Sequence, residues 1–72
     1  MVINRFKALL SVKAAREHRA ISIPKASKET GLSTSLLYAW RDGAVSRFDA
    51  VVLEKLCGYL GCTIGDLLVY RR

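Results

Sequence analysis

The chain has 72 residues, 51% of them hydrophobic, and its twelve Lys and Arg against six Asp and Glu give a formal net charge of +6. This length admits one small domain over residues 1–72 and excludes a separate ligand-sensing or catalytic domain. The hydrophobic fraction suffices for a packed core without metal or disulfide support, and the basic surplus favours a polyanionic partner.

A first helix is predicted to begin after Asn4, whose side chain can cap it, and to run to about His18. Its apolar face has helical spacing and consists of Phe6, Leu9, Leu10 and Ala14, with the stem of Lys13 at its edge. Basic residues recur through this segment, whereas the core of a secretory signal must be apolar. In addition, no apolar run approaches the ~20 residues of a membrane span. We therefore expect no signal segment and no membrane partner.

The second helix is predicted to follow Ser22, which can cap it, with Pro24 in its first turn. Because proline disfavours the α conformation at the preceding Ile23, a start one residue later is the alternative. Gly31 can adopt the left-handed conformation that ends this helix, and the small Ser27 one turn earlier permits close packing.

The third helix is predicted over residues 34–42, after the cap Ser33 and before Gly43. Leu37 and Trp40 lie three apart and share a face, so both are predicted to be buried. The tight glycine turn that precedes this helix sets it across the second one. That arrangement can enter a DNA major groove.

Two more helices are predicted in the C-terminal part of the chain. Asp49 can cap the fourth helix and Gly61 can end it. Thr63 can cap a last short helix through Leu68, with Asp66 complementing its positive end. The fourth helix has one apolar face, formed by Ala50, Leu53, Leu56, Cys57 and Leu60.

Short extended segments are predicted at both ends of the chain, Val2-Ile3 and Val69-Tyr70. Paired strand edges there would join two subunits, so we expect a homodimer held through Val2, Ile3, Val69 and Tyr70. Fraying termini are the alternative.

The two cysteines, Cys57 and Cys62, do not make a metal site, because zinc needs about four ligands and the one histidine, His18, is far away in sequence. Cys57 falls on the apolar face of its helix and Cys62 just past the end of that helix. Both are predicted to be free thiols packed like small hydrophobic groups. No metal, cofactor or small-molecule ligand is expected.

The order of these five helices, with the second and third forming a helix-turn-helix, resembles the Cro and lambda-repressor type of DNA-binding domain, the XRE family. Small stand-alone regulators of that family are similar to this chain in three segments: Arg47–Cys57, Leu60–Thr63 and Gly65–Leu68. The resemblance covers nearly the whole chain and implies an all-α, five-helix fold. It also implies a transcriptional regulator that binds double-stranded DNA, represses at a promoter or operator, and works in the cytoplasm on a bacterial or phage genome.

The chain departs from the family pattern in the second helix. Many members have Gln where this chain has Ile23, which can neither brace the next helix nor reach a phosphate. Many have Leu-Ala where this chain has Ala26-Ser27. These departures bear on the DNA contacts more than on the fold.

Burial of Leu37 and Trp40 leaves the other face of the third helix to meet base edges. The residues predicted to contact bases are Thr34, Ser35, Tyr38 and Ala39. The two hydroxyls can donate or accept at a base edge, the Thr34 methyl can touch thymine, and Ala39 permits close approach. The alternatives are ordinary helix-start chemistry for the hydroxyl residues and a half-buried rim position for Tyr38.

A second set of residues is predicted to contact DNA phosphates: Ser22, Lys25, Lys28, Ser33, Arg41, Ser46 and Arg47. Helix starts offer free N–H groups and a positive dipole end to a phosphate. Arg47 precedes the fourth helix, where the resemblance also implies phosphate contact. Arg41 lies near its helix end, which favours a phosphate over guanine. Solvated surface charge is the alternative for each lysine, and Asp42 is repulsive towards DNA.

No nucleophile motif, phosphate-binding glycine loop or partnered carboxylate pair indicates catalysis, so we do not expect an enzyme. Two other classes stay open. An antitoxin-like or adaptor module would use the scaffold for protein contacts. Ile23 in place of glutamine favours this interpretation and the basic charge opposes it. A test of duplex binding at low salt distinguishes such a module from a DNA-binding protein. A single-strand RNA binder would stack bases on Tyr38, Tyr59 or Tyr70, and competition between duplex DNA and RNA decides.

Overall fold

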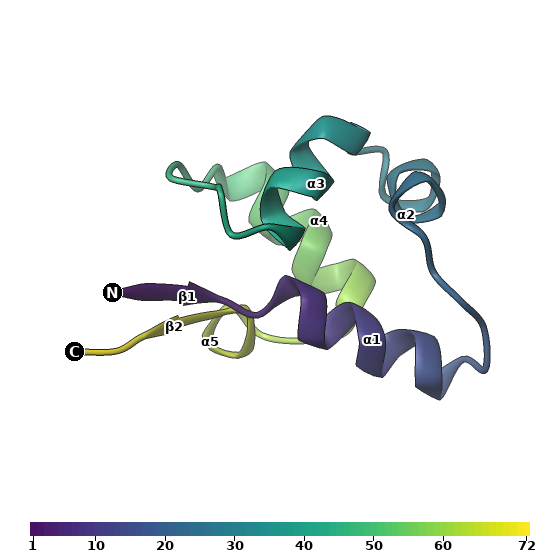
Figure 1. The fold of residues 1–72 in the computed structure, drawn as a ribbon, viewed down its shortest axis with the longest axis horizontal. Coiled ribbons are helices and arrows are strands. Elements are labelled where there is room, and N and C mark those ends of the chain that lie inside the picture. Colours follow the sequence, from purple (N-terminus) through teal and green to yellow (C-terminus); the bar gives the residue numbers. More distant parts are fainter.

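The computed structural model describes residues 1–72 and contains five helices and one two-stranded sheet. The helices are α1 (Phe6–Arg16), α2 (Ile23–Thr30), α3 (Thr34–Arg41), α4 (Ala50–Leu60) and α5 (Ile64–Leu67), and the strands are β1 (Val2–Asn4) and β2 (Leu68–Tyr70). Figure 1 shows the terminal sheet at one end of the molecule and α2 at the other. The predicted five-helix fold is confirmed, with a small sheet added at the termini.

Four helix starts are fixed by side chains that the sequence predicted as caps. The Oγ atoms of Ser22 and Ser33 accept from backbone N–H groups three residues on, at 3.2 Å each. Asp49 Oδ1 accepts from the first turn of α4, and Thr63 and Asp66 form a reciprocal capping box at α5. Each cap satisfies N–H groups that the first helical turn leaves without partners.

The start of α2 decides between the two starts that the sequence left open. The helix begins at Ile23 rather than one residue later, with Ser22 in an extended conformation before it and Pro24 in the first turn. The Ile23 side chain is only 6% exposed. Burial of this side chain in the core outweighs the local bias that proline imposes on the residue before it.

The end of α1 corrects one prediction, because the helix ends at Arg16, two residues before His18. His18 has a φ of 54°, in the left-handed region, and the chain turns there. The Arg19 N–H donates back to the Ala14 carbonyl at 3.1 Å and closes the turn.

Asn4 is the last residue of β1 rather than the cap residue of α1, a position that Arg5 takes. Its Oδ1 nevertheless accepts from the Phe6 N–H at 2.9 Å, so the side chain still satisfies the start of the helix. Pairing of Asn4 with Leu68 in the sheet explains the shift of one residue.

β1 and β2 pair antiparallel within one chain, with Val2 opposite Tyr70 and Ile3 opposite Val69. The prediction of extended ends is confirmed. Each strand finds its partner at the other end of the same chain. The outer edge of each strand stays open.

The core consists of ten buried residues, all hydrophobic. Trp40 and Leu37 of α3 are buried, as predicted. The Trp40 ring meets Phe6 and Phe48 edge-on, with centroid separations of 6.4 Å and 5.6 Å. These contacts fasten α3 to the start of α1 and to the loop before α4.

The small residues of α2 and α4 differ in how they pack. Ala26 is fully buried, whereas its neighbour Ser27 is half-buried, and the Ser27 hydroxyl donates across the turn to the Leu32 carbonyl at 2.5 Å. Ala50, predicted on the apolar face of α4, is exposed. Ala50 lies in the first turn of α4, beyond the reach of the core.

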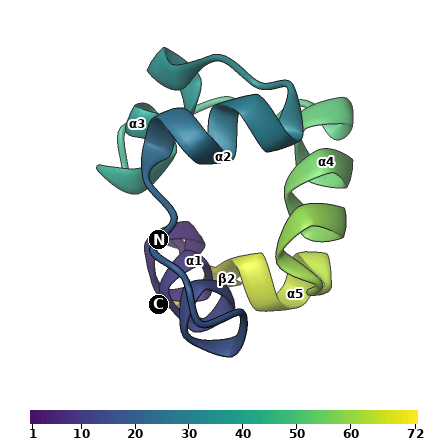
Figure 2. The same cartoon turned by 90° about the vertical axis from the view of Figure 1, so that its right-hand side faces the viewer.

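A network of polar side chains holds the connection between α1 and α2. Arg19 donates to both carboxylate oxygens of Glu29, at 2.9 and 3.0 Å, and to Glu17 at 2.7 Å. The Tyr59 hydroxyl donates to Glu29 at 2.5 Å, and the Lys13 ammonium lies 4.4 Å from the centroid of the Tyr59 ring. The network therefore joins α1, α2 and α4. Figure 2 shows α2 at the top, α4 at the right and α1 below.

This network makes stability depend on pH in the acid range. The Arg19 guanidinium, and after it the Tyr59 hydroxyl, lower the pKa of Glu29 from 4.5 to about 2. The unfolded chain therefore binds more protons between these values, and the stabilisation from Glu29 is complete above about 4.5 and is lost as the pH falls towards 2. We expect Glu29→Gln to lower the melting temperature at neutral pH, with a difference from the wild type that shrinks through this range.

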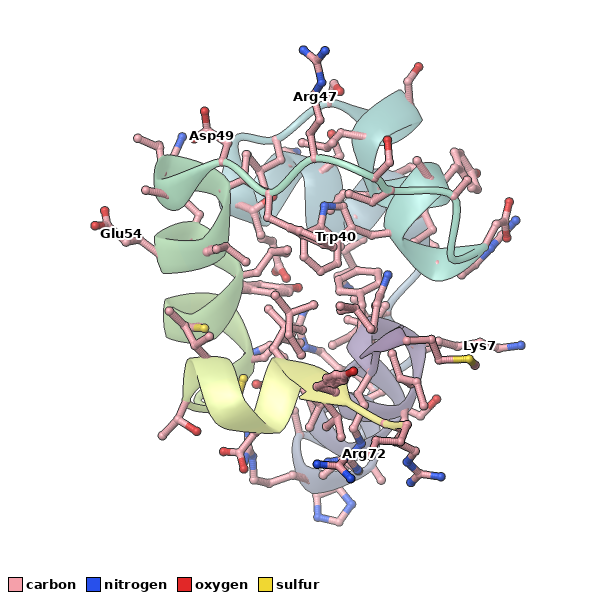
Figure 3. The ribbon with its side chains drawn as sticks, turned by 90° about the vertical axis from the view of Figure 1, so that its left-hand side faces the viewer. Lys7, Trp40, Arg47, Asp49, Glu54 and Arg72 are labelled. Carbon is pink, nitrogen blue, oxygen red and sulfur yellow. The ribbon has the colours of Figure 1, made fainter.

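Thermal unfolding followed by circular dichroism measures this effect. Glu54→Gln is the control, because Glu54 points away from the body of the protein (Figure 3) and should change the melting temperature little. A difference in melting temperature between wild type and Glu29→Gln that stays constant as the pH falls from about 4.5 towards 2 would contradict the prediction.

Candidate nucleic-acid interface

α3 presents its first turn and one side to solvent. Thr34 and Ser35 are exposed, and Tyr38 is 38% exposed. Ala39, beside them, is half-buried. Leu37 on the opposite side is fully buried. The face of α3 that remains is polar at its N-terminal end, where hydroxyl groups can meet hydrogen-bonding partners.

The two serine caps, Ser22 and Ser33, keep a hydrogen-bond donor for an incoming group. Each Oγ accepts one backbone N–H, and accepting leaves the hydroxyl hydrogen free to donate. Other N–H groups of the same helical turns also lack partners within their helices. Both helix starts can therefore receive a phosphate oxygen.

Arg41 is engaged at the end of α3. Its Nε donates to Asp42 at 2.9 Å, and its guanidinium lies 4.7 Å from the centroid of the Tyr38 ring. The hydrogen bond from Arg41 holds the pKa of Asp42 below its usual value, so Asp42 is ionised at neutral pH. Exposed ion pairs contribute little free energy, so a phosphate can displace the carboxylate.

The structure brings Ser22, Tyr38 and Arg41 together around a cavity of about 380 Å³. Lys7 and Ser11 of α1 also line this cavity, and sequence reasoning missed both as candidate contacts. Their spacing of four residues on one helix was the available signal. It did not show that this face of α1 lies beside the start of α2, because that depends on packing between helices.

The remaining predicted phosphate contacts lie elsewhere. Lys25 and Lys28 are exposed on α2, and Ser46 and Arg47 are exposed in the loop before α4. Ser46 lines a groove with residues of β1, apart from the first cavity, and Figure 3 shows Arg47 pointing away from the body of the protein. Because the Asp49 carboxylate already occupies the positive end of α4, Arg47 attracts a phosphate through its own charge.

Asn4 connects the terminal sheet to the end of α3. Its Nδ2 donates to the Trp40 carbonyl at 2.7 Å, while its Oδ1 accepts from Phe6. This carbonyl belongs to the last turn of α3, where intrahelical partners run out. One side chain thereby fixes β1, α1 and α3 relative to one another.

α2, the turn at Gly31 and α3 together define a helix-turn-helix, with α3 exposed where such a unit meets DNA. The sequence profile described as "Cro/C1-type HTH DNA-binding domain" matches residues 12–71. The chain belongs to this family of DNA-binding transcription regulators, which confirms the resemblance found in the sequence. Neither a curated protein nor a solved structure matches the chain. None of its helices has the length and apolar character to cross a membrane.

Proposed function

We propose that this protein, as one domain over residues 1–72, is a sequence-specific repressor that places α3 in the major groove of its operator. The exposed hydroxyls of Thr34 and Ser35, at the start of a helix whose other face is buried, support this proposal most. Tyr38 and Ala39 complete the base-reading face. The protein blocks a promoter in the cytoplasm, on the nucleoid, and performs no catalytic step.

In this proposal phosphate contacts surround the base-reading face. They come from the predicted set, Ser22, Lys25, Lys28, Ser33, Arg41, Ser46 and Arg47, joined by Lys7. Contacts to phosphates fix the register of the protein on the duplex and carry no base information. A surplus of six positive charges on a small surface supports this role.

Selection from a pool of random duplexes tests the proposal directly. We expect an enriched motif, with a binding affinity that falls steeply as salt rises. A pool without enrichment, together with no duplex binding at low salt, would favour a protein-interaction module. Displacement of the duplex by single-stranded RNA at equal concentration would favour an RNA binder.

Arg47→Ala is expected to weaken binding to all duplexes about equally and to lower the salt slope by about one unit. Arg72→Ala is the matched control, because it removes the same charge on the opposite side of the view in Figure 3. Filter binding over a range of salt concentrations measures both. Loss of affinity for one sequence only would assign Arg47 to base reading, and equal effects of the two variants would exclude a local contact.

We further propose that the protein binds as a homodimer through Val2, Ile3, Val69 and Tyr70. One recognition helix reads few base pairs, and two related by a two-fold axis would lie about 34 Å apart on one face of the duplex. The exposed side chains of Val2 and Tyr70, 58% and 69% exposed, favour association at the terminal sheet. The outer strand edges there are open to a second copy.

Tyr70→Pro tests this dimer without cutting the intramolecular sheet. Backbone hydrogen bonds join Met1 and Arg71 across the sheet. Because antiparallel pairs alternate, the Tyr70 N–H points to the outer edge. Sedimentation should show a dimer for the wild type and a monomer for the folded variant. A monomer in both cases with normal operator binding, or a dimer in both, would contradict the proposed interface.

A further inference from the structure

Cys57 and Cys62 lie against each other where α4 gives way to α5. Gly61 ends α4 with a φ of 66°, and the Cys62 N–H donates to the Cys57 carbonyl at 3.1 Å. A helix closed in this way folds the side chain after the glycine back onto the residue five positions earlier. Both cysteines are free, half-buried and packed against the edge of the core.

Burial raises the pKa of the Cys62 thiol, and the neighbouring Cys57 side chain raises it further. The proposed DNA interface uses neither thiol, because both follow the later turns of α4 and Arg47 precedes its first turn. A change at this pair would therefore leave the proposed DNA interface in place.

We propose that Cys57 and Cys62 form a redox modification site that closes an intramolecular disulfide by exchange with a small disulfide such as oxidised glutathione. One protein thiolate attacks a sulfur of the oxidant, which forms a mixed disulfide and releases the first glutathione thiolate. The second protein thiolate then attacks the protein sulfur of that mixed disulfide, which forms the Cys57–Cys62 bond and releases the second glutathione. Two electrons pass from the protein thiols to the oxidant, and the released thiolates take up the two protons.

The disulfide would covalently link the last turns of α4 to the connection that precedes α5. Because it also restricts the unfolded chain, the oxidised form should be the more stable one. For a domain of this size, we expect a rise of about 5 °C in Tm. The raised pKa of Cys62 further predicts that closure is faster at mildly alkaline pH than at neutral pH.

Incubation of the full chain with oxidised glutathione tests the proposal. Intact-mass analysis should show a monomer lighter by two hydrogen atoms and closed to alkylation, with the higher Tm, and dithiothreitol should reverse both changes. Cys57→Ala and Cys62→Ala, each compared with its own reduced form, should show at most one glutathione adduct and no rise in Tm. Stable glutathione adducts on the wild type, disulfide-linked dimers, or closure without a change in Tm would overturn the proposal.

Discussion

Replacement of Trp40 by alanine is expected to cost roughly 3–5 kcal/mol in the free energy of unfolding, a large share of what a small domain has. Trp40 is 1% exposed and its ring packs edge-on against Phe6 and Phe48. Its removal leaves a cavity between α1, α3 and the loop before α4, and three separate segments would have to move to fill it. Urea denaturation followed by circular dichroism measures the loss.

Trp40→Phe separates ring packing from total volume. The indole Nε1 has no hydrogen-bond partner in the structure, so phenylalanine gives up volume without breaking a hydrogen bond. We expect this variant to lose markedly less stability than the alanine variant. Because Trp40 is the single tryptophan, its fluorescence reports its position directly. Emission typical of a water-exposed indole in the native protein would contradict the predicted cost.

Removal of the hydroxyl at Thr34 or Ser35 is expected to cost on the order of 1–3 kcal/mol of binding at one base pair in each half-site, with little effect on non-specific binding. Both side chains are exposed at the start of α3, and Ser33 supplies the cap there. Stability should therefore stay close to that of the wild type. Binding titrations with the selected duplex and its single-base variants measure the effect.

Thr34→Val is the sharper of the two substitutions, since it keeps the methyl group and removes only the hydroxyl. A loss shared by Thr34→Val and Thr34→Ala assigns the hydroxyl to a base edge. A loss seen only in Thr34→Ala assigns the methyl to thymine. An unchanged selected motif in the variants at both positions would show that the proposed register of α3 is wrong.

Helix starts and glycine ends were predictable because they depend on residues close in sequence. Ser33 and Asp49 cap as predicted, and Gly61 ends α4. The end of α1 was not predictable, because the connection after it is held by Arg19 and Glu29, ten positions apart, and by Tyr59 from another helix. The same extended pattern is compatible with strand pairing within one chain and between two chains. The sequence alone therefore did not show that β1 pairs with β2 of the same chain.

The candidate site was predictable to the same extent. The buried pair Leu37 and Trp40 indicated which face of α3 is exposed, because helical periodicity alone determines it. The placement of Lys7 beside Ser22 depends on how α1 crosses α2 and had no local signal. The pairing of Arg41 with Asp42 was also missed, since adjacent residues on a helix do not usually face each other.

The hydrogen bond from Asn4 to the Trp40 carbonyl couples the position of the terminal sheet to that of α3. In the proposed homodimer, a second copy paired with the outer strand edges would act on a sheet whose Asn4 side chain is hydrogen-bonded to the last turn of α3. In that proposed dimer, the orientation of the terminal sheet would influence the orientation of α3 in the major groove. In the proposed dimer, operators with half-sites slightly too near or too far apart would strain this hydrogen bond, so selectivity for half-site spacing would depend on Asn4, far along the chain from the proposed base-contacting residues.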